Sequence, residues 1–347
     1  MVDVRLPRTA STDDQDTRRR APRGVTVGAA LISVYLIWGS TYLALRFGLE
    51  GFPPFLLNAI RFLVAGGMMY AVLRLRGTPS PTPRQWWNAA RVGALMLAGG
   101  VGLVTIAEDV GVGSGVVATA VAVIPLWAAL VSGWFGRWPA RLEWVGLVVG
   151  LAGVIVLAQE GDFTSNPTGM ILVLVAPISW AIGSVWGSQL DLPRPAMATA
   201  TQLLTGGAAL LVLGPLRGER IPEMPPVGAW LALGYLIVFG SIVAYTAYVY
   251  LLRTVRPALA TSYAYVNPVV AVALGVTLGA EVLTGPAFVA LPLILAGVGI
   301  VALAPLRARR DRKSVRLPEL HTASDGRRPT RHQDPSPEPA CCTTEAV

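Results

Sequence analysis

Long apolar stretches alternate with short polar or proline-rich breaks along most of the chain. A helix needs roughly 20 residues to cross the hydrocarbon core of a bilayer. Ten stretches approach this length, at residues 25–45, 55–74, 91–110, 115–135, 143–159, 169–189, 197–214, 228–251, 258–279 and 285–305. The breaks at 76–91 and 215–226 contain several prolines, which are disfavoured inside helices. The pattern therefore predicts an all-α polytopic membrane protein with ten transmembrane helices.

The composition agrees with a membrane protein and excludes a typical water-soluble enzyme. Only 14% of the 347 residues are charged, against roughly 25% in soluble domains. The charges also gather at the ends, because residues 1–24 hold ten of the 48 and residues 306–347 hold fifteen. We expect both segments to be disordered cytoplasmic tails, the second of them basic. Since the basic residues flank apolar stretches and form no single basic face, the expected partner is the lipid bilayer and not nucleic acid.

The distribution of Lys and Arg predicts how the helices are oriented. If the amino terminus is cytoplasmic, the tails and the loops on the same side hold 24 of the 28 Lys and Arg residues. Basic residues are enriched in the cytoplasmic loops of membrane proteins. The sequence therefore predicts a multi-pass protein with both termini in the cytoplasm.

The second half of the chain resembles the first at an offset near 143 residues. At this offset Trp38 falls on Trp180 and Pro125 falls on Pro268. Each copy contains five predicted helices, and because five is odd, the second copy would enter the membrane from the opposite side. Such inverted repeats are common in secondary transporters. The predicted organisation is a tail at 1–24, a first five-helix repeat at 25–159, a linker at 160–168, a second five-helix repeat at 169–305 and a tail at 306–347.

Several short motifs resemble a known family. Residues 38–42 (Trp-Gly-Ser-Thr-Tyr), the prolines at 53–54 and Arg61-Phe62 resemble the opening of an EamA-type repeat of the drug/metabolite transporter superfamily. Residues 179–184 echo that opening in the second half. One departure is Gly136-Arg137, where such repeats usually carry Gly-Glu. The resemblance implies an inner-membrane exporter or permease for small organic metabolites, such as amino acids, related compounds or drugs.

Polar and aromatic side chains within the predicted helices are candidates for the solute pathway. Arg61 is the basic residue that lies well inside a predicted helix, where a charge costs at least a few kcal/mol unless it finds a partner. We expect Arg61 to pair with one of the outer acids Glu50, Glu108 and Asp109, to face the solute, or to reach the headgroups. Helix packing and interfacial anchoring are the alternative roles for the aromatic residues. The candidates are Trp38, Ser40, Thr41, Tyr42, Arg61, Trp180, Ser184, Gln202, Tyr245, Tyr263 and Asn267.

Two prolines and two acids are candidates for movement and energy coupling. Pro125 and Pro268 occupy equivalent mid-span positions, where a proline removes a backbone donor and kinks the helix. They are candidate hinges, with a permanently bent helix as the alternative. Glu108 and Asp109 close the third predicted helix and are the candidates for proton coupling. Hydrated helix ends, with facilitated transport or solute exchange, are the alternative for these acids.

These features together predict a secondary transporter that moves a small organic solute across the membrane by alternating access. A passive channel or pore is the first alternative, and an integral membrane enzyme acting on lipid or isoprenoid is the second. The sequence lacks a phosphate-binding Gly-x-x-x-x-Gly-Lys-Ser/Thr loop and has no cluster of acids or His within the helices. We therefore expect no enzyme activity, catalytic residue, cofactor or metal. The Gly146-xxx-Gly150 spacing indicates close helix packing, and a homodimer stays open.

Overall fold

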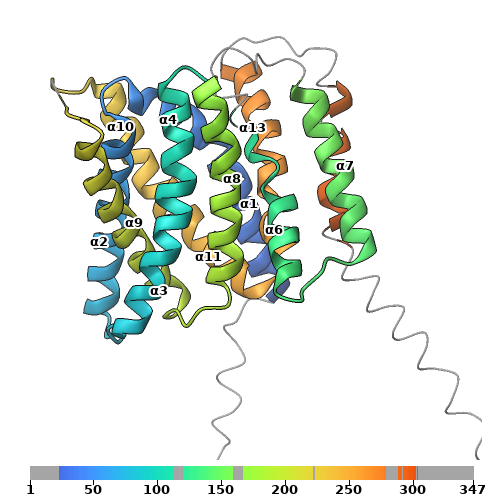
Figure 1. Cartoon of the computed structure of the whole chain (residues 1–347), viewed down its shortest axis with the longest axis horizontal. Helices are drawn as coiled ribbons and strands as arrows, with labels where there is room; N and C mark the ends of the chain where they lie inside the picture. Colours follow the sequence, from blue (N-terminus) through green and yellow to red (C-terminus); the bar gives the residue numbers. More distant parts are fainter. Residues whose placement is uncertain are drawn as a thin grey trace, which may run out of the picture. The chain divides into compact units, whose positions relative to one another are not determined.

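The computed structural model describes residues 23–112, 117, 120–158, 167–221, 223–278, 288–290, 292–301 and 303. The regular structure of these residues is helical (Figure 1). Six helices in the described part are long and apolar enough to cross a membrane: Gly24–Leu49, Pro54–Leu75, Pro83–Asp109, Pro167–Gly187, Pro195–Leu216 and Val227–Thr254. The predicted tails at 1–24 and 306–347 and the linker at 160–168 lie almost wholly outside the described residues.

Four of the long helices are regular α-helices. They are α1 (Arg23–Leu49), α2 (Pro54–Leu75), α8 (Pro167–Gly187) and α9 (Pro195–Leu216). Both α2 and α9 begin at a proline, which suits the first helical position because its missing N–H has no partner there in any case. Both are followed by a glycine of positive φ, Gly77 and Gly218, which ends each helix with a sharp turn.

The third long helix of each half is interrupted by a π-helical segment. In the first half the order is α3 (Pro83–Gly93), η2 (Ala94–Gly102) and α4 (Leu103–Asp109). In the second half it is α10 (Val227–Tyr235), η3 (Leu236–Ala244) and α11 (Tyr245–Thr254). The two π-helical segments stand 142 residues apart at both their first and their last residues. Wide turns of this kind are rare and often lie at functional sites.

The remaining helices are shorter, and two of the predicted spans prove to be interrupted. They are α6 (Ile124–Trp134), α7 (Arg141–Ala158), α12 (Pro257–Ala260), α13 (Tyr263–Leu278) and Phe288–Val301. The fourth and ninth predicted spans, 115–135 and 258–279, are each broken by a turn, at 122–123 and at 261–262.

The third predicted span also begins earlier than residue 91. Its helix starts at Pro83, because the Thr82 side chain and the Gln85 side chain each bond the other's backbone N–H in a capping box. Hydropathy located the apolar part of this helix and missed its polar first turns.

Helix α2 packs along α9, and the two run antiparallel. Gly207 of α9 lies against Leu63 of α2, and Gly214 lies against Leu56. A higher number on α9 thus meets a lower number on α2. Helix α7 and the helix Phe288–Val301 also approach closely, with Gly150 against Gly297. Small residues let two helix backbones approach this closely, and such packing matters in a membrane because no hydrophobic effect drives helices together there.

The first helix of each half packs against helices of the other half. Helix α1 packs against η3, α11 and α13, which belong to the second half. Helix α8 packs against η2, α4 and α6, which belong to the first half. The centre of the helical bundle is therefore built jointly by both halves.

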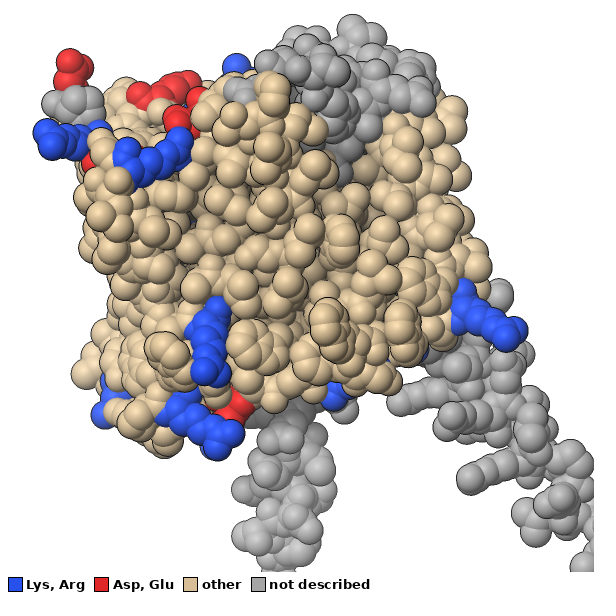
Figure 2. Space-filling model, in the orientation of Figure 1, with Lys and Arg blue, Asp and Glu red and all other residues tan. Residues whose placement is uncertain are grey.

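The outer surface carries an apolar band between two charged ends. Large apolar side chains such as Ile32, Leu36, Val148 and Ile171 are exposed along the helices. In Figure 2 the described Lys, Arg, Asp and Glu residues lie towards the two ends, and tan residues cover the face between them. Arg74, in the last turn of α2, lies at one of these two charged ends. This surface is what a bilayer core requires, so the chain is a multi-pass membrane protein.

Candidate solute pathway

A cavity of about 80 Å³ lies where the helices of the two halves meet. Residues of α1, α2, η2, α4, α6, α8, η3, α11 and α13 line it. Eight of the eleven pathway candidates from the sequence are among the lining residues: Trp38, Thr41, Tyr42, Arg61, Trp180, Tyr245, Tyr263 and Asn267.

Three candidates lie elsewhere. Ser40 points away from the cavity, and its hydroxyl is 2.6 Å from the Tyr235 hydroxyl of α10. Ser184 and Gln202 line a second, much smaller cavity of about 10 Å³. Both residues stay predictions for the solute pathway, beside the smaller cavity and not beside the main one.

An aromatic layer packs along one side of the main cavity, and it consists of Trp38, Trp180, Tyr245, Tyr248 and Tyr263. The ring of Trp38 meets that of Trp180 edge to face with centroids 5.4 Å apart, and it meets that of Tyr263 at 4.6 Å. The Tyr248 ring is tilted against both, with its centroid 5.0 Å from that of Trp38 and 5.6 Å from that of Trp180. Such offset and edge-on pairs favour a well-defined arrangement of the rings.

Hydrogen bonds connect this aromatic layer to the smaller cavity. The Trp180 indole N–H donates to the Tyr248 hydroxyl at 3.2 Å, and that hydroxyl donates to Ser184 at 2.8 Å. The Tyr245 hydroxyl donates to the Gln202 side-chain oxygen at 2.8 Å. Since Ser184 and Gln202 line the small cavity, the aromatic layer stands between the two cavities.

Arg61 reaches the main cavity from α2 and is only 5% exposed. Its Nε–H donates to the Ser241 hydroxyl at 2.8 Å, and Nη1 donates to the Asn58 side-chain oxygen at 3.3 Å. Gly240 lies so close that a methyl group there would be 2.8 Å from Nη2. Within the described residues Arg61 forms no ion pair, so the expected pairing with Glu50, Glu108 or Asp109 is not made.

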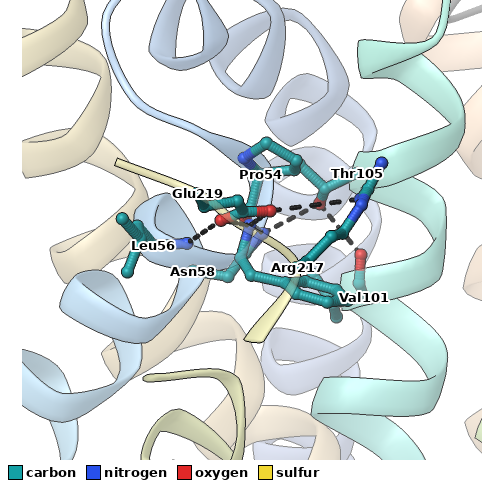
Figure 3. Close-up of polar contacts among 8 residues, drawn as sticks. Pro54, Leu56, Asn58, Val101, Thr105, Arg217 and Glu219 are labelled. Carbon is teal, nitrogen blue, oxygen red and sulfur yellow. Dashed lines mark hydrogen bonds and ion pairs between the residues drawn. The ribbon is translucent and has the colours of Figure 1, made fainter. Parts of the chain in front are cut away.

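A polar network holds the start of α2 in place (Figure 3). Glu219, in the loop after α9, accepts hydrogen bonds from the backbone N–H groups of Phe55 and Leu56 at 3.0 Å each. Asn58 donates to the Thr105 hydroxyl of α4 at 2.8 Å, and Thr105 donates to the Val101 carbonyl of η2. The network ties α2, and with it Arg61, to both halves of the bundle.

The two acids that were coupling candidates have different surroundings. Both carboxylate oxygens of Glu108 are buried and lack a hydrogen-bond partner within the described part of the chain. Asp109 is exposed and borders a wide cleft of about 590 Å³, together with Glu50 and the loop that contains Glu219. Asn267 also has a buried side-chain oxygen without a partner among the described residues.

The two candidate hinge prolines are placed differently. Pro268 lies inside α13, one residue after Asn267, as a mid-helix proline. Pro125 lies in the first turn of α6, directly after the break at 122–123, so it starts a helix and does not kink one. A proline at a helix start removes no intrahelical hydrogen bond.

Sequence reasoning missed the residues that hold Arg61. Asn58 and Ser241 were not among the candidates, although both are fully buried polar side chains. Asn58 stands three residues before Arg61 and therefore shares its helix face, which the sequence does contain as a signal. Ser241 contacts Arg61 from another helix, so no local pattern predicts it.

Comparison with known proteins agrees with this architecture. A model of the EamA-like transporter family matches residues 26–159 and again residues 167–303. The chain belongs to the EamA-like transporter family. This confirms the family resemblance of the sequence motifs and makes the chain a membrane transporter of that family.

Individual relatives agree with this family, and one solved structure shares the fold. The chain is 48% identical over 274 residues to the uncharacterized inner membrane transporter YedA of Escherichia coli K12, covering 79% of this chain and 90% of YedA. It is 28% identical to the protein PecM of Dickeya dadantii, covering 80% of this chain and 92% of PecM. A crystal structure with 21% identity superimposes with a TM-score of 0.66 over 82% of this chain and 99% of the other, and so shares the fold.

Proposed function

We propose that this transporter is a secondary carrier that moves a small organic solute across the inner membrane by alternating access. The observation that carries the proposal is a cavity built by both halves, with an aromatic layer between it and a second small cavity. A carrier needs a central site with a closable barrier on at least one side. The layer of Trp38, Trp180, Tyr245, Tyr248 and Tyr263 is our proposed barrier.

Three observations support an inverted arrangement of two five-helix repeats. The family model matches twice, once in each half. The equivalent helices α2 and α9 run antiparallel. The π-helical segments η2 and η3 stand at the same offset as the repeat. Ten membrane-spanning helices with both termini in the cytoplasm complete the proposed topology.

Within this cycle we assign two further roles. Pro268 is the proposed hinge because it interrupts α13 beside the cavity-lining Asn267. Glu108 is the preferred coupling residue over Asp109 because its carboxylate is buried and has no hydrogen-bond partner within the described residues.

Counterflow in proteoliposomes tests the carrier cycle. The purified protein is reconstituted into vesicles loaded with a metabolite extract, and uptake of labelled solutes is followed. We expect uptake to be accelerated by the same solute on the other side, because a carrier returns faster when loaded. Flux that is indifferent to solute on the opposite side would contradict the carrier and favour a channel.

A comparison of metabolites inside and outside cells identifies the solute. Strains that overproduce the protein are compared with deletion strains by untargeted mass spectrometry. We expect one compound or chemical class to change in opposite directions in the two strains. If no compound does so, transport of a small organic solute is contradicted.

A further inference from the structure

We propose, resting on the carrier function above, that the cargo is an organic anion: a carboxylate, or a similar acid, on an apolar or aromatic body. The proposal names the substrate class of the cavity lined by Arg61. It follows from the charge of that cavity, from the unused hydrogen-bond donors of Arg61 and from the nature of the opposite wall.

The cavity carries one formal positive charge. Arg61 is the charged residue among the described lining residues, and no Asp or Glu is among them. Glu108 lies one turn beyond the lining residue Val104, but its own carboxylate does not line the cavity. A buried guanidinium without a counter-charge is strongly unfavourable, so an anionic cargo would stabilise the loaded state.

Arg61 also has hydrogen-bonding capacity left over. A guanidinium has five N–H donors in a planar fork. Two of them are used within the described residues, Nε–H on Ser241 and one N–H of Nη1 on Asn58. Three remain, two of them on Nη2, whose neighbour Gly240 has no side chain to cover it. The fork of a guanidinium matches the two oxygens of a carboxylate.

The protein holds this fork in a fixed position before any cargo binds. Ser241, which accepts from Nε, donates in turn to the Leu236 carbonyl of η3 at 3.0 Å. Asn58, which accepts from Nη1, donates to Thr105 and to the Pro54 carbonyl. Preorganised donors lose little conformational freedom on binding, which favours their role in recognition.

The rest of the cavity suits an apolar body and not a second charge. Val101, Val104, Ile124 and Pro177 line it together with the rings of Trp38, Trp180, Tyr245 and Tyr263. Among the described lining residues, the buried acceptor that lacks a donor is the Asn267 side-chain oxygen, which is an uncharged amide oxygen. An ammonium group pairs more strongly with a carboxylate than with an amide. The cavity therefore favours a simple anion over a zwitterion or a cation.

Three ligands of one size separate these possibilities. 3-Phenylpropionate is an anion, 3-phenylpropanamide is neutral and phenylalanine is a zwitterion. Their binding to the full-length protein in lipid nanodiscs is measured by titration calorimetry. We expect 3-phenylpropionate to bind at least about tenfold more tightly than the other two. Equal binding of the amide, tightest binding of phenylalanine or no binding of the acid would overturn the proposal.

Variants locate the preference at Arg61. In Arg61→Gln we expect the preference for the acid over the amide to disappear, and in Arg61→Lys to persist in weakened form. Arg74→Gln is the matched control, because Arg74 is exposed on the same helix and donates to Thr78. A preference that survives Arg61→Gln would overturn the proposal. If Arg61→Gln does not fold, binding of the three ligands to the wild-type protein and to Arg61→Lys still tests the proposal.

Counterflow distinguishes failure of this inference from failure of the carrier function. Exchange of a neutral or cationic solute, without exchange of any anion, would overturn the anion assignment and leave the carrier intact. Absence of trans-accelerated exchange for every solute would overturn the carrier itself.

Discussion

Several single side chains in this transporter fix the position of a neighbouring helix. Glu219 is the clearest case, because a loop residue of the second half caps the first turn of α2 from the first half. A carboxylate at a helix start satisfies unpaired N–H groups and interacts favourably with the helix dipole. The charge of Arg61 lies two turns further along the same helix.

Replacing Glu219 with Ala should lower stability by about 1–2 kcal/mol, since two backbone donors lose their acceptor. Thermal unfolding of the detergent-solubilised protein measures the change as a lower midpoint temperature. Glu223→Ala is the control, because Glu223 lies in the same loop and is exposed. Equal midpoints for the two variants would contradict the capping role.

The aromatic layer makes a second residue-scale prediction. Tyr248→Phe keeps the ring and removes the hydroxyl that accepts from Trp180 and donates to Ser184. The Trp180 N–H is then buried without a partner, which costs about 1–3 kcal/mol. We expect a lower unfolding midpoint for Tyr248→Phe and an unchanged one for Tyr250→Phe, which is only half-buried. A midpoint equal to wild type would show that these hydrogen bonds contribute nothing.

The site was predictable at this scale wherever helix periodicity decides orientation. Trp38 and Tyr42 are four residues apart and both line the cavity. Ser40 is two residues from each, so it faces away from them and bonds Tyr235 instead. Contacts between helices, such as that of Arg61 with Ser241, depend on the fold and are not contained in local spacing.

At the scale of elements, the positions and order of the long helices followed from hydropathy, and their irregularities did not. The breaks at 122–123 and 261–262 and the two π-helical segments lie inside apolar stretches. Hydropathy averaged over a stretch of residues does not indicate where the backbone hydrogen-bonding pattern changes. Capping residues are more informative, as the box formed by Thr82 and Gln85 shows.

The contact between α7 and the helix Phe288–Val301 is tight enough to predict a sharp effect. A methyl group at Gly297 would lie 2.5 Å from the backbone nitrogen of Gly150, which cannot move like a side chain. We expect Gly297→Ala to cost at least about 1–3 kcal/mol through overpacking. Gly299→Ala is the control, since nothing lies within 4 Å of that position. Comparable yield and unfolding midpoint for the two variants would contradict the contact.

The proposed hinge in α13 predicts a change in rate and not in affinity. Pro268→Ala restores a backbone donor in the helix interior and straightens the helix. We expect slower counterflow with unchanged binding of the solute, because only the conformational step is affected. Pro215→Ala, near the end of α9, is the control for a proline removed from a helix outside the cavity. Unchanged exchange in Pro268→Ala would leave α13 as a permanently bent helix.

At the scale of the whole molecule, the distribution of basic residues predicts the topology. A fluorescent protein fused to either terminus should be fluorescent, because this reporter folds in the cytoplasm. Alkaline phosphatase fused after Gly218 should be active, because the loop that follows α9 is predicted to face outwards. A terminus found on the outer side would contradict the proposed topology and, with it, the inverted repeat.

The paired π-helical segments have a consequence for how this fold tolerates change. Each residue added to or removed from an α-helix rotates everything beyond it by about 100°. A π-helical segment closes i→i+5 hydrogen bonds and so holds about one residue more per turn than an α-helix. Deleting one residue between 94 and 102 would therefore let this segment re-form as α-helix, with Val104 still in the cavity wall and Thr105 still facing Asn58. The same deletion in the regular turns of α3 or α4 has no such outlet, so there it would rotate the pocket residues away from their partners.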